Sequence, residues 1–466
     1  MSGLAASSSM YRAEVRPSLI RPLMTALAIL WICFFLLLYV LSFKAEAWAV
    51  FGIGLVTGSV FCAWRWPFAT VLALIAILPF QPLPTMVAQA IGVPYIHIIS
   101  GVKEGLFVIA ILSGLNHRRS KFQAVDYILV GLILMAVVSR LFGGYWMGIK
   151  DDWEFALPFA AGRLFSIPAE YELRWVKIVM ASMSVVAVLG ILEYLFVPLE
   201  LRMLWVGMTQ AATQFSAMGY SGERIGSTLA GPAEFGNLCA LALILWVAYR
   251  SRLDRKWLGA VGLLAIGLFL SLTRSAWIAA AIGSIFFEFR SGSKVRVLVM
   301  ASACVALFLA LLPTLGLKQF YSYTASGEDP SLEGHIRSVE KYVNVTIEHP
   351  LGTGPGTVGP RALERDPTAV DIESSYLTIS VQYGILSGIL FVLFCFLCLK
   401  GCLDNPSRLG LAAASMLLGY LLMLAIMPGH QSLPTAALVL FPVGAALNKK
   451  SWHGSRFGPI AAEKTS

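Results

Sequence analysis

Arginines in the polar segments between long apolar runs have the surroundings of anion sites. Arg224 belongs to a glycine-containing stretch that leads into an apolar run with Pro232 in its first turn. Proline is favourable there, and a helix N-terminus beside a guanidinium attracts anions. Arg274 lies in a short turn between two apolar runs. The alternatives are an exposed loop arginine for Arg224 and a side chain reaching lipid phosphates for Arg274.

Arg337 precedes a glycine-rich segment, His349-Pro-Leu-Gly-Thr-Gly-Pro-Gly356. Gly352, Gly354 and Gly356 permit positive φ angles and close approach of the backbone to a ligand. We predict that Arg337, on a helix, and the N–H groups of this turn bind one anion together. A guanidinium stays charged at all pH values and can bind the oxygens of an anion in a fork.

A carboxylate heads the apolar run that follows. Glu373 precedes two serines and Tyr376, and a carboxylate in this position can take a proton from a hydroxyl group. Its reference pKa of about 4.3 makes it a weak base unless burial raises the value. The alternative is a helix cap, since a carboxylate favours a helix N-terminus by roughly 0.3–1 kcal/mol. His335 and His349 are the next candidates for a base, although the turn at Pro350 favours a structural role for His349.

The composition indicates which elements must position these groups. Of the 466 residues, 58% are hydrophobic and 13% are charged, against roughly 25% charged in a soluble domain. This excludes a soluble enzyme and a disordered chain, and continuous apolar runs exclude a transmembrane β-barrel. The net charge of +9 indicates topology rather than nucleic-acid binding, because the basic residues lie in short loops. The seven cysteines lie in or beside apolar runs, which predicts packing rather than disulfides or a metal site.

We therefore predict an all-α, polytopic transmembrane helix bundle of about 12–14 crossings with one large external loop. The least certain segment is 153–169, which carries Arg163 and two prolines, and 67–89 and 430–447 are also marginal. The candidate crossings are 22–43, 46–63, 67–89, 98–115, 126–142, 153–169, 174–197, 231–250, 256–272, 275–289, 296–316, 375–400, 407–427 and 430–447.

The distribution of basic residues predicts the orientation. With both ends in the cytoplasm, 22 Lys and Arg residues are cytoplasmic, 11 are external and 2 lie within helices, as the positive-inside rule requires. Within the external loop 317–374, apolar residues at helical spacing predict a helix over Glu333–Ile347 near the membrane surface. The expected divisions are a cytoplasmic N-terminus 1–21, a bundle 22–316 with an external loop 198–230, the large periplasmic loop 317–374, C-terminal helices 375–447 and a cytoplasmic tail 448–466.

The order of these motifs over 220–390 resembles the O-antigen ligase and polymerase superfamily. The matching stretches are Arg224-Ile-Gly-Ser-Thr228, Leu272-Thr-Arg-Ser-Ala-Trp277, Arg337 with His349-Pro-Leu-Gly-Thr-Gly-Pro-Gly356, and Glu373-Ser-Ser-Tyr-Leu377. The resemblance implies a multi-pass glycosyltransferase of the bacterial inner membrane that uses polyprenyl-diphosphate-linked sugars. It also implies catalytic roles for Glu373, Arg337 and Arg224, and substrate binding by Arg274, Gly352, Gly354, Gly356, His349 and Tyr376.

The sequence departs from the family at one position. The ligases place a histidine where this chain has Glu373, and in the family that histidine activates the acceptor hydroxyl. The acidic variant resembles exopolysaccharide polymerases, so we expect polymerisation of lipid-linked repeat units into exopolysaccharide or O-antigen. The alternative is a ligase or oligosaccharyltransferase that moves glycan to lipid-A core or protein. A transporter and a non-catalytic scaffold are further alternatives.

The expected reaction is metal-independent and inverting, with no cofactor. The external loops hold no Asp-x-Asp pair suited to Mg²⁺, and arginines can compensate the charge of a diphosphate leaving group. The expected partners are a polyprenyl-diphosphate-linked glycan donor, a glycan acceptor and the lipid bilayer. The resemblance leaves room for other polysaccharide-assembly proteins as partners, and no nucleic acid is expected.

Overall fold

The structure is a computed structural model, and it describes residues 57–83, 96–115, 122–165, 167–198, 224–229, 231–299, 302, 330–363, 366, 369 and 372–448. The side chains of 96–100, 169, 330–338, 360 and 363 are not described. Several expected segments fall outside these residues: the N-terminus 1–21, the crossing 22–43, most of 46–63 and 296–316, most of the loop 198–230, and the tail beyond 448.

The predicted all-α class is confirmed: the described residues form helices and no strand. The helices are α4 Pro67–Ile77, η1 Leu78–Phe80, α6 Ile96–Leu115, α7 Ala124–Ser139, η2 Arg140–Phe142, α8 Trp146–Trp153, α9 Ala156–Leu164, α10 Ala169–Phe196, α13 Pro232–Tyr249, η3 Arg250–Arg252, α14 Trp257–Leu270, α15 Arg274–Arg290, α18 Pro330–Glu348, α19 Pro360–Leu363, α20 Ser375–Tyr383, α21 Ile385–Leu403, α22 Arg408–Ile426, η4 Gly429–Gln431 and α23 Leu433–Ala446.

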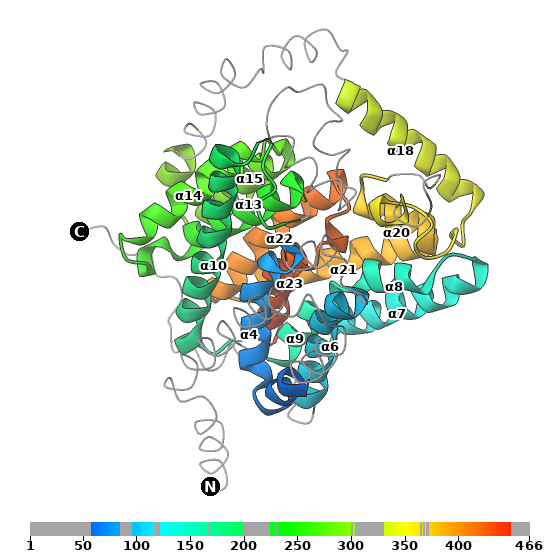
Figure 1. The fold of residues 1–466 in the computed structure, drawn as a ribbon, viewed down its shortest axis with the longest axis horizontal. Helices are drawn as coiled ribbons and strands as arrows, with labels where there is room; N and C mark the ends of the chain where they lie inside the picture. The colour runs from blue at the N-terminus through cyan, green and yellow to red at the C-terminus, as the bar shows by residue number, and fades with distance from the viewer. Residues whose placement is uncertain are drawn as a thin grey trace, which may run out of the picture.

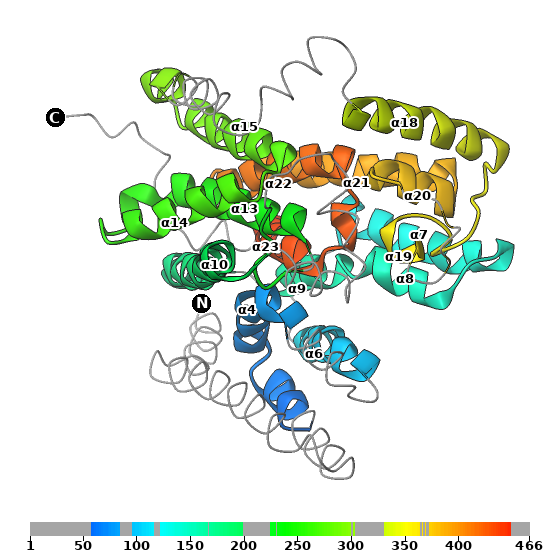
Figure 2. The same cartoon turned by 45° about the horizontal axis from the view of Figure 1, so that its top comes forward.

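Five of the described helical stretches are long and apolar enough to cross a membrane. They are Ala124–Phe142, Glu170–Phe196, Pro232–Arg252, Ile385–Leu403 and Arg408–Ile426. Large apolar side chains are exposed along α7, α10 and α21, including Leu134, Leu195 and Ile389. Such faces suit contact with lipid rather than water. Figures 1 and 2 show α10, α13, α14 and α15 on one side, α7, α8 and α20 on the other, and α22 and α23 between them.

Several predicted crossings differ from the structure. The apolar helices Pro67–Phe80, Trp257–Leu270 and Leu433–Ala446 are shorter than the five spans, and two further segments differ more. The segment 153–169 is not one helix, because it holds the last residue of α8, the nine-residue helix α9 and the first residue of α10. Helix α9 spans about 14 Å at 1.5 Å per residue, which is half the length of a crossing. The segment 375–400 is two helices, because Gly384 adopts φ 91° between α20 and α21. Residues with a side chain rarely adopt that angle. The positive φ of Gly384 ends α20 and turns the chain into α21.

Helix α23 lies at the centre of the bundle, and all of its residues are buried. It packs most extensively against α9. A Cβ atom at Gly162 of α9 would lie 2.1 Å from the carbonyl oxygen of Phe441, and one at Gly444 of α23 would lie 2.3 Å from that of Phe159. The two glycines therefore permit backbone-to-backbone contact, a device typical of helix pairs in membranes.

This contact predicts that two similar substitutions differ strongly in their effect on the free energy of unfolding. Gly162→Val must push α9 away from α23 and is expected to lower the free energy of unfolding by about 1–3 kcal/mol. Gly131→Val on α7 is the matched control, because no atom lies within 4 Å of a Cβ atom at Gly131. Thermal unfolding of both variants in detergent measures the difference, and equal melting temperatures would contradict this packing.

Three ionisable residues inside the helix bundle, Lys103, Glu104 and Arg163, have polar partners. Arg163 donates two hydrogen bonds to Asp126, at 2.9 and 2.7 Å. Lys103 donates to Gln81 Oε1 at 3.0 Å, and the Glu104 carboxylate lies 3.2 Å from Lys150 Nζ. A charge buried without a partner costs several kcal/mol, so these contacts explain how the bundle holds the charges. Cys395, Cys398 and Cys402 are free and buried, as packing residues should be.

Candidate active site

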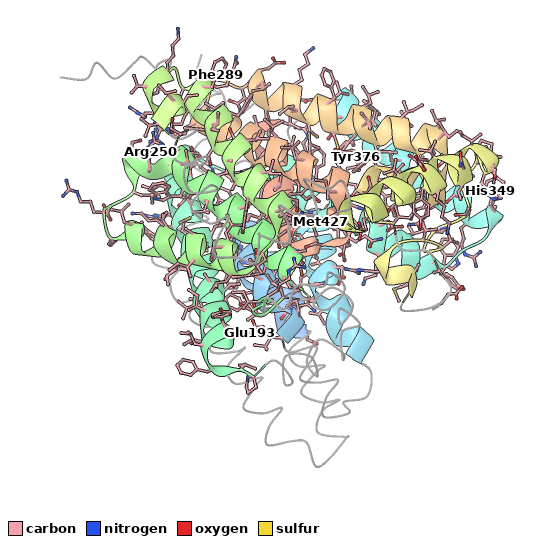
Figure 3. All side chains as sticks on the ribbon, turned by 90° about the horizontal axis from the view of Figure 1, so that it is seen from above. Glu193, Arg250, Phe289, His349, Tyr376 and Met427 are labelled. Carbon is pink, nitrogen blue, oxygen red and sulfur yellow. The ribbon has the colours of Figure 1, made fainter. Side chains whose placement is uncertain are left out.

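Several turns meet at one end of the bundle, and Met427, just after α22, connects them. Its sulfur lies 3.6 Å from Ser275 Oγ on α15 and 3.7 Å from Asn237 Nδ2 on α13. Its carbonyl oxygen accepts a hydrogen bond of 2.9 Å from Ser375 Oγ at the start of α20. Figure 3 shows Met427 near the middle of the molecule, with Arg250 and Phe289 at the far ends of α13 and α15. The N-terminal ends of three helices therefore meet here.

Arg224 lies among these turns. Its Nε donates to the carbonyl oxygen of Ser271 at 3.1 Å and its Nη2 to Thr273 Oγ1 at 3.3 Å. Thr273 Oγ1 in turn donates to the carbonyl oxygen of Pro232 at 3.1 Å, which ties the arginine to the first turn of α13. Arg274 is the first residue of α15. The Arg224 side chain thus bridges the segment before α13 and the turn before α15.

The two arginines are close enough to affect each other's charge. Burial and the charge of Arg274 lower the pKa of Arg224 to about 10. The guanidinium therefore stays protonated at neutral pH, and like charges held together in a partly buried position are unfavourable. Guanidinium groups bind phosphate oxygens in a fork, so an anion that contacted both arginines would be held by charge and by hydrogen bonds.

The backbone beside each arginine is strained. Ser227 adopts φ 56° and Leu272 adopts φ 50°, and among the described residues no other non-glycine has a positive φ. Ser227 is held by its N–H donating to Glu193 Oε2 at 2.6 Å and by its Oγ donating to the carbonyl oxygen of Val186 at 2.6 Å. Strain of this kind costs about 1–3 kcal/mol and persists where function or packing over-determines it. Here the two hydrogen bonds of Ser227 hold the loop that carries Arg224 in this conformation.

Glu373 approaches the same region from α20. It precedes the N-cap residue Ser374 and is half-buried, whereas Ile372 and Ser375 are fully buried. The hydrogen bond from Ser375 to Met427 holds this end of α20 against the end of α22. The structure therefore brings the segment of Glu373 to the turns that carry Arg224 and Arg274. The Arg337 side chain lies outside the described residues, and only its backbone is placed, in α18.

The glycine-rich turn does not present its amides to a ligand, which corrects that prediction. The Gly352 N–H donates to the carbonyl oxygen of His349 at 2.8 Å, and the Gly354 N–H to that of Gln382 at 3.0 Å. The Gly356 N–H donates to Gln382 Oε1. A Cβ atom at Gly354 would lie 2.5 Å from the backbone of Gly143. The glycines thus allow the turn to pack between the α20–α21 junction and the segment before α8.

His349 and Tyr376 are also placed away from the arginines. His349 is exposed, and Figure 3 shows it at the edge of the molecule, well separated from Met427. Tyr376 points into the bundle, where its hydroxyl donates to the carbonyl oxygen of Leu421 at 3.2 Å and its ring lies 5.7 Å from that of Phe391. These contacts place His349 on the surface and Tyr376 in the packing of α20 against α21 and α22, and substrate binding by either residue stays a prediction.

The predicted helix in the large loop is confirmed as α18, with a different packed face. Tyr342 and Thr346 are buried, and the apolar cluster of Tyr342 with Val381 joins α18 to α20. Val339, Val343 and Ile347, which defined the predicted apolar stripe, are exposed. Their contact with the membrane surface stays a prediction.

A buried polar network beside α20 was not found from the sequence. Arg361 on α19 donates to Asp151 at 2.9 Å, to Glu154 at 3.3 Å and to the carbonyl oxygen of Gln431 at 2.6 Å. His430 lies in η4, and its side chain is 1% exposed. The adjacent carboxylates Asp151 and Asp152 were the only sequence signal, and they lie far along the chain from η4.

Comparison with known proteins identifies the segment that holds most of these groups. Residues 259–392 match the family model described as O-antigen ligase. The resemblance to the O-antigen ligase superfamily is confirmed. The matched segment contains Arg274, Arg337 and Glu373, and it begins after Arg224. No curated protein matches the chain. Together with the five described helices that are able to cross a membrane, the match over 259–392 supports a multi-pass membrane enzyme of the O-antigen ligase or polymerase type.

Proposed function

We propose that this chain polymerises polyprenyl-diphosphate-linked oligosaccharide repeat units on the external face of the bacterial inner membrane. The observation that carries the proposal is the pair of half-buried arginines, Arg224 and Arg274, held beside the segment of Glu373. Such a transfer needs positive charge that stabilises the anionic leaving group and a group that accepts the proton of the attacking hydroxyl. The O-antigen ligase match supports the same chemistry.

In the proposed reaction, a sugar hydroxyl of the acceptor attacks the anomeric carbon of the donor. The bond from that carbon to the diphosphate oxygen breaks, and the electron pair leaves with the diphosphate. Arg224 and Arg274 stabilise the leaving group, because guanidinium groups bind phosphate oxygens in a fork. Glu373 takes the proton of the hydroxyl. Attack from the side opposite the diphosphate gives inversion.

Loss of the gene tests the proposal in cells. A deletion strain is expected to lose the polymer and to accumulate single lipid-linked repeat units, and the intact gene should restore the polymer. The second candidate, ligation to lipid-A core or protein, is favoured by the match to a family described as O-antigen ligase. In that case the deletion strain would keep long lipid-linked chains and lose glycan from the final acceptor, which would overturn the polymerase proposal.

The orientation predicted from the basic residues has a direct test. Asn344 on α18 and Asp254 between α13 and α14 are both exposed. In a cysteine-free background, Asn344→Cys is expected to react with a membrane-impermeant thiol reagent on intact spheroplasts, whereas Asp254→Cys should react only after lysis. The reverse pattern would contradict an external loop 317–374.

The proposed reaction uses arginine charges in place of a divalent cation. Transfer by the purified protein is therefore expected to continue at an unchanged rate after dialysis against EDTA. The measurement is the initial rate with and without added Mg²⁺ or Mn²⁺. A rate that falls more than tenfold with EDTA and returns with one of these cations would contradict metal-independent transfer.

A further inference from the structure

A buried amide on α13 lies near the two arginines and has no partner for its oxygen. Asn237 is about 8 Å along the helix from Pro232, at 1.5 Å per residue, and it is 2% exposed. All residues from Leu238 to Ala248 are hydrophobic. Asn237 Oδ1 receives no hydrogen bond from the part of the chain that the structure describes. A carbonyl oxygen that loses its hydrogen bonds to water without replacement disfavours the folded state, so a functional reason for this amide is expected.

The nitrogen of the same amide has a weak partner, the sulfur of Met427. Asn237 Nδ2 lies 3.7 Å from this sulfur, and Ser275 Oγ on α15 lies 3.6 Å from it. A thioether sulfur is a weak hydrogen-bond acceptor. Two donors from different helices therefore converge on an atom that binds them poorly, and an oxygen atom in the same position would accept stronger hydrogen bonds from both.

The Met427 side chain is able to leave this position while its backbone stays in place. Met427 is half-buried, and Ala425 and Ile426 before it are exposed. A methionine side chain is unbranched and has three rotatable bonds. The backbone is held by the Met427 N–H, which donates to the carbonyl oxygen of Met423 at 2.8 Å, and by the hydrogen bond from Ser375 to the Met427 carbonyl oxygen. The sulfur can therefore be displaced by a ligand without rearrangement of the bundle.

The hydrogen-bonding groups of the amide fit a sugar better than a diphosphate. The oxygens of a phosphate group are acceptors, so they offer no donor to Asn237 Oδ1. A hydroxyl group both donates and accepts. Two neighbouring hydroxyls of a sugar match the edge of the amide, because one can accept from Nδ2 and the other can donate to Oδ1. The Ser275 hydroxyl adds a further donor to the first of them.

The amide is close to the turns that carry the arginines. Ser275 directly follows Arg274 in the chain. A Cβ atom at Gly236, next to Asn237, would lie 2.9 Å from Thr273 Cβ, and Thr273 Oγ1 accepts from Arg224 Nη2 at 3.3 Å. A diphosphate at the arginines and hydroxyl groups at Asn237 are therefore neighbouring parts of one ligand.

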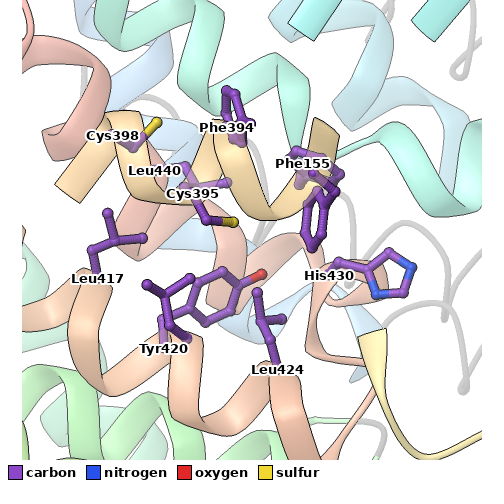
Figure 4. A pocket seen from close by; sticks show the side chains of 11 residues that line it. Phe155, Phe394, Cys395, Cys398, Leu417, Tyr420, Leu424, His430 and Leu440 are labelled. Atoms are coloured by element: carbon purple, nitrogen blue, oxygen red, sulfur yellow. The ribbon is translucent and has the colours of Figure 1, made fainter. Parts of the chain in front are cut away.

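The apolar pocket between α21 and α22 is a poorer place for a sugar. Figure 4 shows mainly aliphatic and aromatic side chains around it, with His430 at its edge. The Tyr420 hydroxyl in its wall already donates to the carbonyl oxygen of Gly429 at 3.0 Å, and His430 Nδ1 lies 2.8 Å from Ser375 Oγ. These polar groups have partners within the protein, unlike the oxygen of Asn237.

We propose that Asn237 and Ser275 bind hydroxyl groups of the sugar that is linked to the diphosphate, in the position of the Met427 sulfur. The inference rests on the proposed function, because it takes Arg224 and Arg274 as the diphosphate site. Met427 also holds the first turn of α20 through Ser375. The bound sugar therefore lies where the arginine turns meet the end of α20 that follows Glu373.

Donors that lack single hydroxyl groups test this contact. Each hydroxyl of the diphosphate-linked sugar is replaced in turn by hydrogen, and kcat/KM is measured for every donor with the wild-type protein and with Asn237→Leu. At least one deoxy donor is expected to lower the wild-type kcat/KM by roughly 10–100-fold, because it leaves buried polar groups unpaired. Asn237→Leu should use the natural donor and this deoxy donor at similar, low rates.

The matched control is Asn405→Leu, which removes a buried amide whose two polar atoms both have partners. Asn405 Nδ2 donates to the carbonyl oxygen of Ala446 at 2.8 Å, and Oδ1 accepts from the Ser407 N–H at 2.9 Å. Asn405→Leu is expected to lower the melting temperature and to keep the wild-type ratio of kcat/KM between the two donors. Asn237→Leu should keep the melting temperature and lose the ratio. The ratio does not depend on the fraction of protein that is folded.

A wild-type ratio in Asn237→Leu would overturn the proposal, and so would equal use of all donors by the wild-type protein. If Asn237→Leu fails to fold, Ser275→Ala gives the decision: a smaller ratio supports the contact and a wild-type ratio overturns it. Absence of transfer by the wild-type protein would refute the proposed function instead. The dissociation constants of the same donors then decide on the sugar contact, so the two failures are distinguishable.

Discussion

Replacing Glu373 with glutamine is expected to lower the rate of glycan transfer by roughly 10²–10⁴-fold, the usual contribution of a positioned base. Glutamine keeps the size and hydrogen bonding of the side chain but cannot take a proton. In cells, polymer should become undetectable and lipid-linked repeat units should accumulate. Polymer length on a gel and the amount of repeat units in the lipid extract measure the two effects.

Glu373→His is the informative companion to this variant. It restores the residue that the ligases place at this position, so partial activity would show that the position needs a proton acceptor. If Glu373 only capped α20, the glutamine variant would cost about 0.3–1 kcal/mol of stability at most and would polymerise normally. Normal polymer from Glu373→Gln would therefore refute the assignment of Glu373 as the base.

Replacing Arg274 with lysine is expected to lower kcat by roughly 10²–10³-fold, the range for loss of one group that stabilises developing charge. Lysine keeps the positive charge and loses the planar fork that binds phosphate oxygens. Arg290→Lys is the matched control, because Arg290 ends the same helix at the opposite end of the bundle and is exposed. Its rate should equal that of the wild type.

Inorganic pyrophosphate provides a second measurement on the same variants. It is expected to raise the melting temperature of the wild-type protein, because a ligand that binds only the folded state stabilises it. The increase should be lost in Arg274→Lys and Arg224→Lys and kept in Arg290→Lys. An equal increase in all four proteins would place the anion elsewhere.

The sequence was a good guide to the helices whose apolar runs have the length of a membrane crossing. The apolar runs of α7, α21 and α22 are continuous. Away from water their backbone N–H and C=O groups must bond to each other, so these runs form helices. The predictions failed where a short polar or glycine interruption decided the path. Gly384 divides one apolar run into α20 and α21, and hydropathy alone does not report a positive φ.

The candidate site was predictable from the sequence only where its residues lie beside the start of an apolar helix. Arg224 and Arg274 stand beside helix starts, which sequence motifs reveal. The role of Gly354 was misassigned because a glycine that approaches a ligand and one that approaches Gly143 have the same sequence signature. His430 was missed because its partner Ser375 lies 55 residues away, and only the fold brings them together.

The central claim is that Arg224, Arg274 and Glu373 form one site for transfer from a polyprenyl diphosphate. The most direct measurement uses purified protein in proteoliposomes with the polyprenyl-diphosphate-linked repeat unit as the sole glycan substrate. The account predicts a ladder of lengthened lipid-linked glycan, release of polyprenyl diphosphate in equal amount to the linkages formed, and neither product from Glu373→Gln or Arg274→Lys. A ladder of the same rate and length from both variants would contradict it.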